Sequence, residues 1–182
     1  MHEEMLKDNV RTAAYRDSII KNKHLFKGKV VLDIGCGTGI LSLFALRDGE
    51  AKHVYAVDNA DIHHFASKIL KVAGYEKKVT VIKGKIEEIM REGKIPKHGI
   101  DVIISEWMGY FLLYESVLDS IVAVRDHYLN PKNPKATVWP NRVQLFAAAI
   151  DDRDHYQRKV RHWEDVFGFD MSCMMSATQK EA

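Results

Sequence analysis

A glycine-rich turn between an apolar segment and an amphipathic one constrains the fold of this chain more than any other feature. Residues 29–39 read K-V-V-L-D-I-G-C-G-T-G, and apolar residues at helical spacing follow over residues 40–47. The apolar run predicts a buried strand, and the glycines let the backbone approach a ligand where a β-carbon would clash. Amides at the start of the next helix favour an anionic group. The pattern therefore predicts a strand, turn and helix unit that binds a nucleoside.

An acid after the second predicted strand supports the same interpretation. Asp58 follows the glycine turn at a distance suited to hydrogen-bond both hydroxyls of a ribose. The glycines are Gly35, Gly37 and Gly39, so Ile40 stands where a dinucleotide fingerprint has its third glycine. The spacing favours a single nucleoside and argues against a dehydrogenase. The alternative is a tight structural turn with an acid nearby by chance.

Strand and helix patterns alternate along most of the chain. We expect strands over residues 29–33, 53–57, 79–83, 100–105 and 136–139, and helices over residues 40–47, 61–72 and 116–128. This alternation predicts an α/β fold with a doubly wound parallel sheet that binds ligands at the carboxyl ends of its strands. The Gly35 turn, Asp58, Glu87 and Glu106 all fall at that edge.

Two glutamates bracket an apolar and aromatic loop at residues 105–116, S-E-W-M-G-Y-F-L-L-Y-E-S. Removing a carboxylate from water costs on the order of several kcal/mol unless a cation lies beside it. Glu106 and Glu115 therefore favour a cation, and a planar guanidinium can satisfy two carboxylates at once. The alternative is that Glu106 ends a strand in a surface turn and Glu115 begins the next helix. From the two glutamates alone, both interpretations stand.

Composition limits the class of protein. A length of 182 residues with 46% hydrophobic content suits one domain with a further segment and excludes disorder. The chain has no apolar run that could span a bilayer and no secretory signal, so we expect a soluble intracellular protein. Cys36 and Cys173 form no C-x-x-C pattern, so we expect neither a disulfide nor a metal site. A net charge of +2 points to neither nucleic acid nor membrane.

The two ends of the chain predict elements outside the sheet. Apolar residues near helical spacing predict an amphipathic helix over residues 3–22. After Pro140, residues 142–150 predict one more strand, and residues 151–167 form a charged, aromatic segment with rough helical periodicity. This tail is too short to bury its own aromatic side chains. We therefore expect it to pack on the sheet domain or on another copy of the chain.

Taken together, three motifs resemble the protein arginine N-methyltransferases: V-L-D-I-G-C-G-T-G, V-D at residues 57–58, and the double-glutamate loop. The resemblance continues through W-E-D-V-F-G-F-D-M-S-C at residues 163–173. It implies a Rossmann-like, class I S-adenosylmethionine-dependent methyltransferase domain with its N-terminal helix over residues 1–139. It also implies that residues 140–182 hold the first strand of a truncated β-barrel domain and a helical dimerisation arm.

The resemblance assigns residues to S-adenosylmethionine, whose demethylated product is S-adenosylhomocysteine. The cofactor-binding residues are Arg11, Asp33, Gly35, Gly37, Asp58 and Glu87. By this resemblance Arg11 binds the methionyl carboxylate, Asp58 the ribose hydroxyls and Glu87 the adenine amino group. Asp58 departs from the family pattern, which more often has a glutamate, so this contact must come from a side chain one methylene shorter.

The resemblance also implies how methyl transfer occurs. Glu106 and Glu115 grip the guanidinium of a substrate arginine, His2 and Met5 match an H-x-x-M pair that borders the active site, and Asp8 matches an acid that faces a histidine of the barrel. Two carboxylates that hold the other donors can localise positive charge away from one nitrogen, which then attacks the sulfonium methyl in line. No metal is expected to take part.

The same resemblance suggests partners and products. We expect arginine-containing protein substrates such as histones and glycine- and arginine-rich RNA-binding proteins, mono- and asymmetric dimethylation, and a location in cytoplasm and nucleus. A homodimer is expected through residues 151–176, with Tyr156, Trp163 and Phe167 docked on the partner's cofactor domain. Direct nucleic-acid or membrane partners are not expected. Without a T-H-W loop or an aromatic segment before H-x-x-M, weak or absent activity is expected of the chain alone.

Two other functions fit parts of the pattern. A methyltransferase for a nucleic acid or small molecule would share the glycine turn, but its pocket should carry a basic or base-stacking surface. A non-catalytic family member could bind the cofactor and regulate a partner through the arm. Intact Glu106 and Glu115 argue against this second function.

Overall fold

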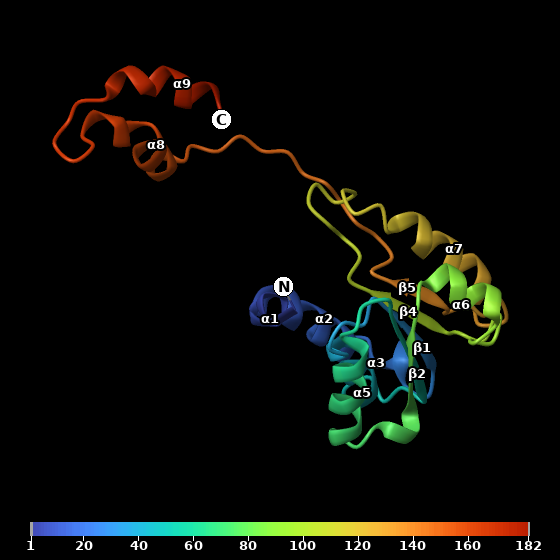
Figure 1. The fold of residues 1–182 in the computed structure, drawn as a ribbon. Helices are drawn as coiled ribbons and strands as arrows, with labels where there is room; N and C mark the ends of the chain where they lie inside the picture. The colour runs from blue at the N-terminus through green and yellow to red at the C-terminus, as the bar shows by residue number, and fades with distance from the viewer. Residues whose placement is uncertain (1, 182) are drawn as a thin grey trace. The chain divides into compact units, whose positions relative to one another are not determined.

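The computed structural model describes residues 2–181 and divides into two compact units after Gln144 (Figure 1). This division lies a few residues beyond the boundary expected at Trp139. It falls within residues 141–152, which have no regular secondary structure. Within residues 2–181, every helix is too short or too polar to span a lipid bilayer.

The first unit is built on a parallel sheet of five strands, in the order β3-β2-β1-β4-β5. The strands are β1 (Val30–Ile34), β2 (His53–Asp58), β3 (Val79–Lys83), β4 (Val102–Ser105) and β5 (Thr137–Trp139). In the central register, Leu32 lies opposite Tyr55 on one side and Ile103 on the other. The strand order reverses beside β1, and open parallel sheets bind ligands at such a point. The predicted doubly wound sheet is confirmed.

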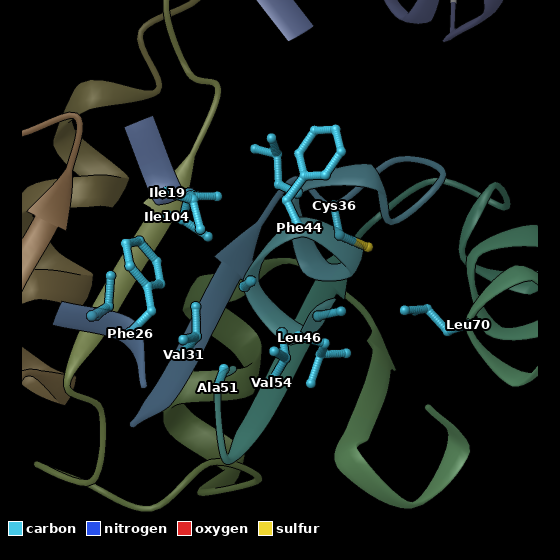
Figure 2. Packing of buried hydrophobic residues seen from close by; sticks show 14 of the residues in the cluster. Ile19, Phe26, Val31, Cys36, Phe44, Leu46, Ala51, Val54, Leu70 and Ile104 are labelled. Atoms are coloured by element: carbon cyan, nitrogen blue, oxygen red, sulfur yellow. The ribbon is translucent and has the colours of Figure 1, made fainter. Parts of the chain in front are cut away.

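Helices cover both faces of this sheet, because neighbouring residues of the central strands alternate between two buried layers (Figure 1). Val31 and Ile104 pack on one face, whereas Leu32 and Ile103 pack on the other. The first face is covered by α2 (Asn9–Lys21), α3 (Lys23–Phe26), α4 (Ile40–Arg47) and α5 (His63–Val72), and the second by α6 (Ile86–Glu92) and α7 (Leu118–Tyr128). Figure 2 shows the first layer, in which Phe26 lies near Val31.

Three contacts fasten α2 to the sheet. Ile19 is fully buried in the first layer. The indole N–H of Trp139 in β5 donates to Ser18 Oγ at 3.0 Å, and the hydroxyl of Tyr15 donates to the carbonyl of Ser105 at 3.0 Å. Since Ser105 is the last residue of β4, α2 is held across the carboxyl ends of the strands.

The N-terminal segment differs from the single helix expected over residues 3–22. It forms α1 (His2–Lys7) and α2, separated at Asp8. The Asp8 side chain accepts a hydrogen bond from the backbone N–H of Arg11 at 3.0 Å. Aspartate favours this N-cap position because its carboxylate satisfies an amide that has no partner within the helix. The break therefore has a local cause that helical periodicity alone did not show.

Another difference is α6, which the sequence analysis did not predict. Only two of its residues, Ile86 and Ile89, are buried, so its apolar pattern is too short to stand out. Glu87, expected at the carboxyl edge just after the third strand, lies in the first turn of this helix.

The strand expected over residues 142–150 is wrong for this structure. No described residue pairs with this segment, and a strand requires a neighbour that satisfies its backbone N–H and C=O groups. Apolar composition alone could not supply that neighbour. The β-barrel to which this strand was assigned stays a prediction.

Beyond Gln144, the second unit contains short helical segments. They are α8 (Arg153–Lys159), α9 (Met175–Lys180) and 3-10 turns at Arg161–Glu164 and Ser172–Met174. Asp152 caps α8 by accepting from the backbone N–H of His155 at 2.8 Å. The helical periodicity expected over residues 151–167 is confirmed only for α8 and the turn after it. Few side chains of the unit are buried; Val160 and Thr178 are the most enclosed of those described.

Replacing Ile19 by alanine tests how α2 is held. Ile19 is fully buried, so we expect Ile19→Ala to lower the free energy of unfolding by about 2–5 kcal/mol. Its neighbour Ile20 is 48% exposed, and Ile20→Ala should cost less than about 1 kcal/mol. Urea unfolding followed by circular dichroism measures both variants. Equal losses would contradict the packing of α2 through Ile19.

Candidate active site

A cavity of about 110 Å³ lies between the N-terminal helices and the carboxyl ends of the central strands. It is smaller than the roughly 300–1,000 Å³ of a typical ligand pocket, so it can enclose only one end of a nucleoside-bearing ligand. The predicted site residues that line it are His2, Met5, Arg11, Gly35, Gly37, Asp58 and Glu106. The fold thus brings together residues from α1, α2, the glycine turn, β2 and the loop after β4.

The glycine turn and Asp58 form one hydrogen-bonded unit. Gly35 and Gly37 adopt φ values of 71° and 53°, in the left-handed region where a β-carbon is strained. The N–H of Gly37 donates to Asp58 Oδ2 at 2.8 Å, and the N–H of Ala60 donates to Asp58 Oδ1 at 2.8 Å. Each carboxylate oxygen keeps a further acceptor position. Asp58 is therefore held in place and can still accept from two neighbouring hydroxyls.

Arg11 and Glu106 pair with each other across the cavity. The Arg11 Nη1 donates to Glu106 Oε2 at 2.9 Å, and Nη2 donates to the carbonyl of Met5 at 2.5 Å. Burial raises the pKa of Glu106, the Arg11 guanidinium opposes that shift, and the negative charge of Glu115 adds to it. A partly buried carboxylate of this kind needs a cation. In this structure, a guanidinium already fills that place.

Glu115 lies outside the cavity wall and is exposed. The loop nevertheless turns back on itself, because the N–H of Gly109 donates to the carbonyl of Leu112 at 3.2 Å. A β-carbon at Gly109 would lie 2.7 Å from Glu115 Cγ. A larger residue at this position would displace the Glu115 side chain, whose charge reaches Glu106. Sequence analysis missed this positioning role, although a glycine between two glutamates was a visible signal.

Backbone strain gathers in the same loop. Phe111, Leu112 and Ser116 have φ values of 50°, 64° and 54°. Residues other than glycine rarely adopt this region, and such strain is typical of functional loops. The loop conformation is therefore imposed by its surroundings and does not follow from local preference.

Asp33 is placed apart from the cavity. It lies in β1 with no exposed surface; its Oδ2 accepts from Ser42 Oγ at 2.7 Å, and its Oδ1 has no partner among residues 2–181. Burial raises the pKa of Asp33 to about 7, against the effect of the Ser42 hydrogen bond. A role at the cofactor stays a prediction for this residue.

Glu87 and Asp8 also stay outside the cavity wall. Glu87 is exposed on α6 and accepts from Ser120 Oγ at 2.5 Å, which lowers its pKa. Asp8 acts here as the cap of α2. Their predicted roles toward adenine and toward a barrel histidine therefore stay predictions.

Sequence analysis missed Tyr15 and Thr12, which line the cavity. The hydroxyl of Tyr15 donates to the carbonyl of Ser105, next to Glu106. Burial raises the pKa of Tyr15, and the charge of Glu106 adds to this, so the phenol stays a neutral donor. Tyr15 follows Arg11 by four residues on α2, and that spacing alone puts both side chains on one helix face.

Comparison with known proteins agrees with this geometry. A model of the methyltransferase domain matches residues 25–134, and a model of the arginine methyltransferase oligomerization subdomain matches residues 141–182. Protein arginine N-methyltransferase 1 of Schizosaccharomyces pombe is 51% identical over 181 residues, which cover 100% of this chain. The chain belongs to the protein arginine N-methyltransferase family. A second family member, protein arginine N-methyltransferase 1 of Dictyostelium discoideum, is 49% identical over the same length.

Solved structures of arginine methyltransferases have the same fold. A Trypanosoma brucei PRMT1 enzyme-prozyme heterotetrameric complex with AdoHcy superposes with a TM-score of 0.77 at 42% identity, over 97% of this chain and 53% of that chain. A structure of PRMT6 with SAH gives a TM-score of 0.82 at 32% identity, over 99% and 57% of the two chains. This chain spans 51% of the length of both curated arginine methyltransferases.

The buried carboxyl of Asp33 predicts a pH dependence of stability. Its pKa of about 7 exceeds the ordinary aspartate value of 3.8, so between these values the folded chain binds a proton that the unfolded chain releases. Stability should therefore fall as pH rises from about 4 to about 7, by at most about 1.4 kcal/mol per pH unit. Asp33→Asn removes this titration and should flatten the profile. Urea midpoints measured across this range test it; parallel profiles for both proteins would contradict it.

Proposed function

We propose that this chain forms the cofactor half of a protein arginine N-methyltransferase that methylates a guanidinium nitrogen of arginine in protein substrates. One observation carries the proposal. Glu106 faces the same cavity as Asp58 and the glycine turn, and it already binds a guanidinium at 2.9 Å. The names of its relatives support the activity, and the AdoHcy in the Trypanosoma brucei structure supports the cofactor.

The residues of the cavity fit S-adenosylmethionine. Asp58 offers two positioned carboxylate oxygens to the ribose hydroxyls, and Gly35, where a β-carbon would meet nothing within 4 Å, leaves space along the cofactor backbone that Gly37 also flanks. The small cavity suits the methionyl end, for which Arg11 supplies the cation. Adenine then lies outside the cavity, where Glu87 is exposed. When bound, the cofactor supplies an electrophilic methyl group on a sulfonium.

The Arg11–Glu106 pair implies an order of events. Arg11 can exchange Glu106 for the carboxylate of the cofactor, because both are anions within reach of one guanidinium. Glu106 is then left partly buried without its cation, which favours the guanidinium of a substrate arginine. Cofactor binding therefore prepares the substrate site.

Methyl transfer then follows from the two carboxylates. Glu106 and Glu115 hold donors of the substrate guanidinium and draw its positive charge away from the attacking nitrogen. That nitrogen must lose a proton as its bond to the methyl group forms, and a carboxyl whose pKa is raised, such as Glu106, suits this acceptance. His2 and Met5 border the site. Alignment of two bound substrates supplies much of the remaining acceleration.

The substrate classes proposed from the resemblance are histones and glycine- and arginine-rich RNA-binding proteins, with mono- and asymmetric dimethylarginine as products. Both classes place the activity in the cytoplasm and nucleus. The acidic loop supports a cationic protein substrate over a nucleic acid.

The second unit supports self-association. Val166 and Phe169 pair across a two-residue turn, and Phe167 at its tip has φ 55° and 99% of its surface exposed. A large ring held out by a strained backbone is poorly explained by the stability of the unit alone. We infer that residues 151–176, which fall within the matched oligomerization subdomain, join two copies in a homodimer.

Binding of S-adenosylhomocysteine tests the cofactor class directly. In calorimetric titrations of this chain, we expect selective binding over NAD, retained in Glu106→Gln and lost in Asp58→Ala. The role of Glu106 in the double-glutamate loop is tested by methyl transfer to a glycine- and arginine-rich peptide. The chain is kept in excess over the cofactor in this assay. Glu106→Gln should lower that rate by about 10²-fold or more. No binding of S-adenosylhomocysteine, or a measurable rate that is unchanged in Glu106→Gln, would overturn the assignment.

Replacing Phe167 by alanine tests the dimer. Sedimentation equilibrium should show dimers of the unmodified chain, and Phe167→Ala should raise the dissociation constant by about tenfold or more. Phe146 is 81% exposed but precedes residues 151–176, so Phe146→Ala is the matched control and should leave the constant unchanged. If the unmodified chain is a monomer at all concentrations, the proposed dimer through residues 151–176 is contradicted.

A further inference from the structure

The segment that leads from β2 into the start of α5 carries a cluster of metal-ligating side chains outside the cavity. Asp61, His63 and His64 each offer one ligand atom, and the three atoms lie within 4.8 Å of one another. Ligands bonded to zinc at 2.0–2.1 Å in a tetrahedron are about 3.3 Å apart. Side-chain rotations that move the three ligand atoms by about 1 Å would therefore bring them to bonding distance of one ion. Sequence analysis considered cysteine spacing and so missed D-x-H-H.

His63 is already oriented as a ligand. Its Nδ1 lies 2.9 Å from the carbonyl oxygen of Ala60. A carbonyl can only accept, so Nδ1 carries a proton, which leaves Nε2 as the ring nitrogen that can bind a metal ion. Metal-bound histidines are commonly fixed by such a bond to a backbone carbonyl.

The second imidazole lies beside the first. The ring centroids of His63 and His64 are 3.9 Å apart, with planes tilted by 40°. Consecutive residues of a helix normally point in different directions. This convergence places two nitrogen donors together at the start of α5, next to the carboxylate of Asp61.

The carboxylate of Asp61 pairs with the ammonium of Lys83, which would compete only weakly with a metal ion. Lys83 Nζ lies 2.5 Å from Asp61 Oδ1, and the two side chains are 51% and 82% exposed. Exposed ion pairs of this kind contribute little. A doubly charged ion bound by two imidazoles as well can therefore replace the ammonium.

The cluster is tied to the cofactor acid through one residue. The N–H of Ala60 donates to Asp58 Oδ1 at 2.8 Å, while its C=O accepts from His63. An ion that fixes Asp61 and His63 would also fix Ala60 between them. The position of the Asp58 carboxylate would then be ordered before a ribose reaches it.

We propose that Asp61, His63 and His64 form a binding site for a divalent transition metal, and that the bound ion strengthens cofactor binding by ordering Asp58. Two imidazoles and one carboxylate suit zinc, nickel or copper better than magnesium or calcium. None of the three ligands lines the cavity, so the ion is regulatory and takes no part in methyl transfer. The link to the cofactor rests on the proposed function; the metal site itself does not.

Zinc titration tests the site without any reference to activity. In a Cys173→Ser background, which removes the exposed thiol, we expect one zinc ion per chain by calorimetry. His64→Ala and Asp61→Asn should each weaken binding at least tenfold, whereas His24→Ala, at an exposed histidine of α3, should not. Lys83→Met should tighten binding, because it removes the competitor. Equal affinities in all variants would overturn the site.

The coupling between the metal site and cofactor binding is measured by titrating the chain with S-adenosylhomocysteine, with and without saturating zinc. We expect zinc to raise its affinity about fivefold or more, with no effect in His64→Ala. Linkage requires the ligand to raise zinc affinity by the same factor. An unchanged affinity would overturn the ordering of Asp58. Failure of the ligand to bind at all would instead refute the proposed function, and the zinc titration would still decide the metal site.

Discussion

The need of a partly buried carboxylate for a cation organises this structure. Glu106 directly follows strand β4 and precedes Trp107, and the guanidinium of Arg11 on α2 compensates its charge at 2.9 Å. That contact, with the hydrogen bond from Tyr15 to Ser105, holds the N-terminal helices over the carboxyl edge of the sheet. The cavity exists because of this arrangement. The same demand for a guanidinium underlies the proposed recognition of arginine.

The parallel sheet explains why distant residues meet at this point. Parallel strands place their carboxyl ends along one edge, so the turn after β1, Asp58 at the end of β2 and Glu106 after β4 become neighbours. The hydrogen bond from Gly37 to Asp58 locks two of these three together. Ala60 extends the same network away from the cavity, toward Asp61 and His63. The proposed cofactor site and the proposed metal site therefore share one short stretch of backbone.

Predictions from the sequence succeeded where a feature is determined by local residue pattern or by the carboxyl edge that parallel strands share. Hydrophobic periodicity indicated the strands of the sheet, and glycines marked the turn. They failed where a partner decides the outcome: residues 142–150 are apolar enough for a strand but have none to pair with among the residues described. Asp33 belongs to the right motif, yet its side chain points into the interior. Glu115 is close to Glu106 but lies outside the cavity wall.

By itself the sequence determined the fold class, the nucleoside-binding turn and the identity of the two loop carboxylates, because these depend on residue type and spacing. Only the tertiary structure decided that the guanidinium of Arg11 pairs with the carboxylate of Glu106, a residue 95 positions away. It also decided that Asp33 is buried and that His63 and His64 converge with Asp61. Such contacts depend on how α2 and α5 pack on the sheet and on which neighbours satisfy each polar group. No local pattern encodes that choice.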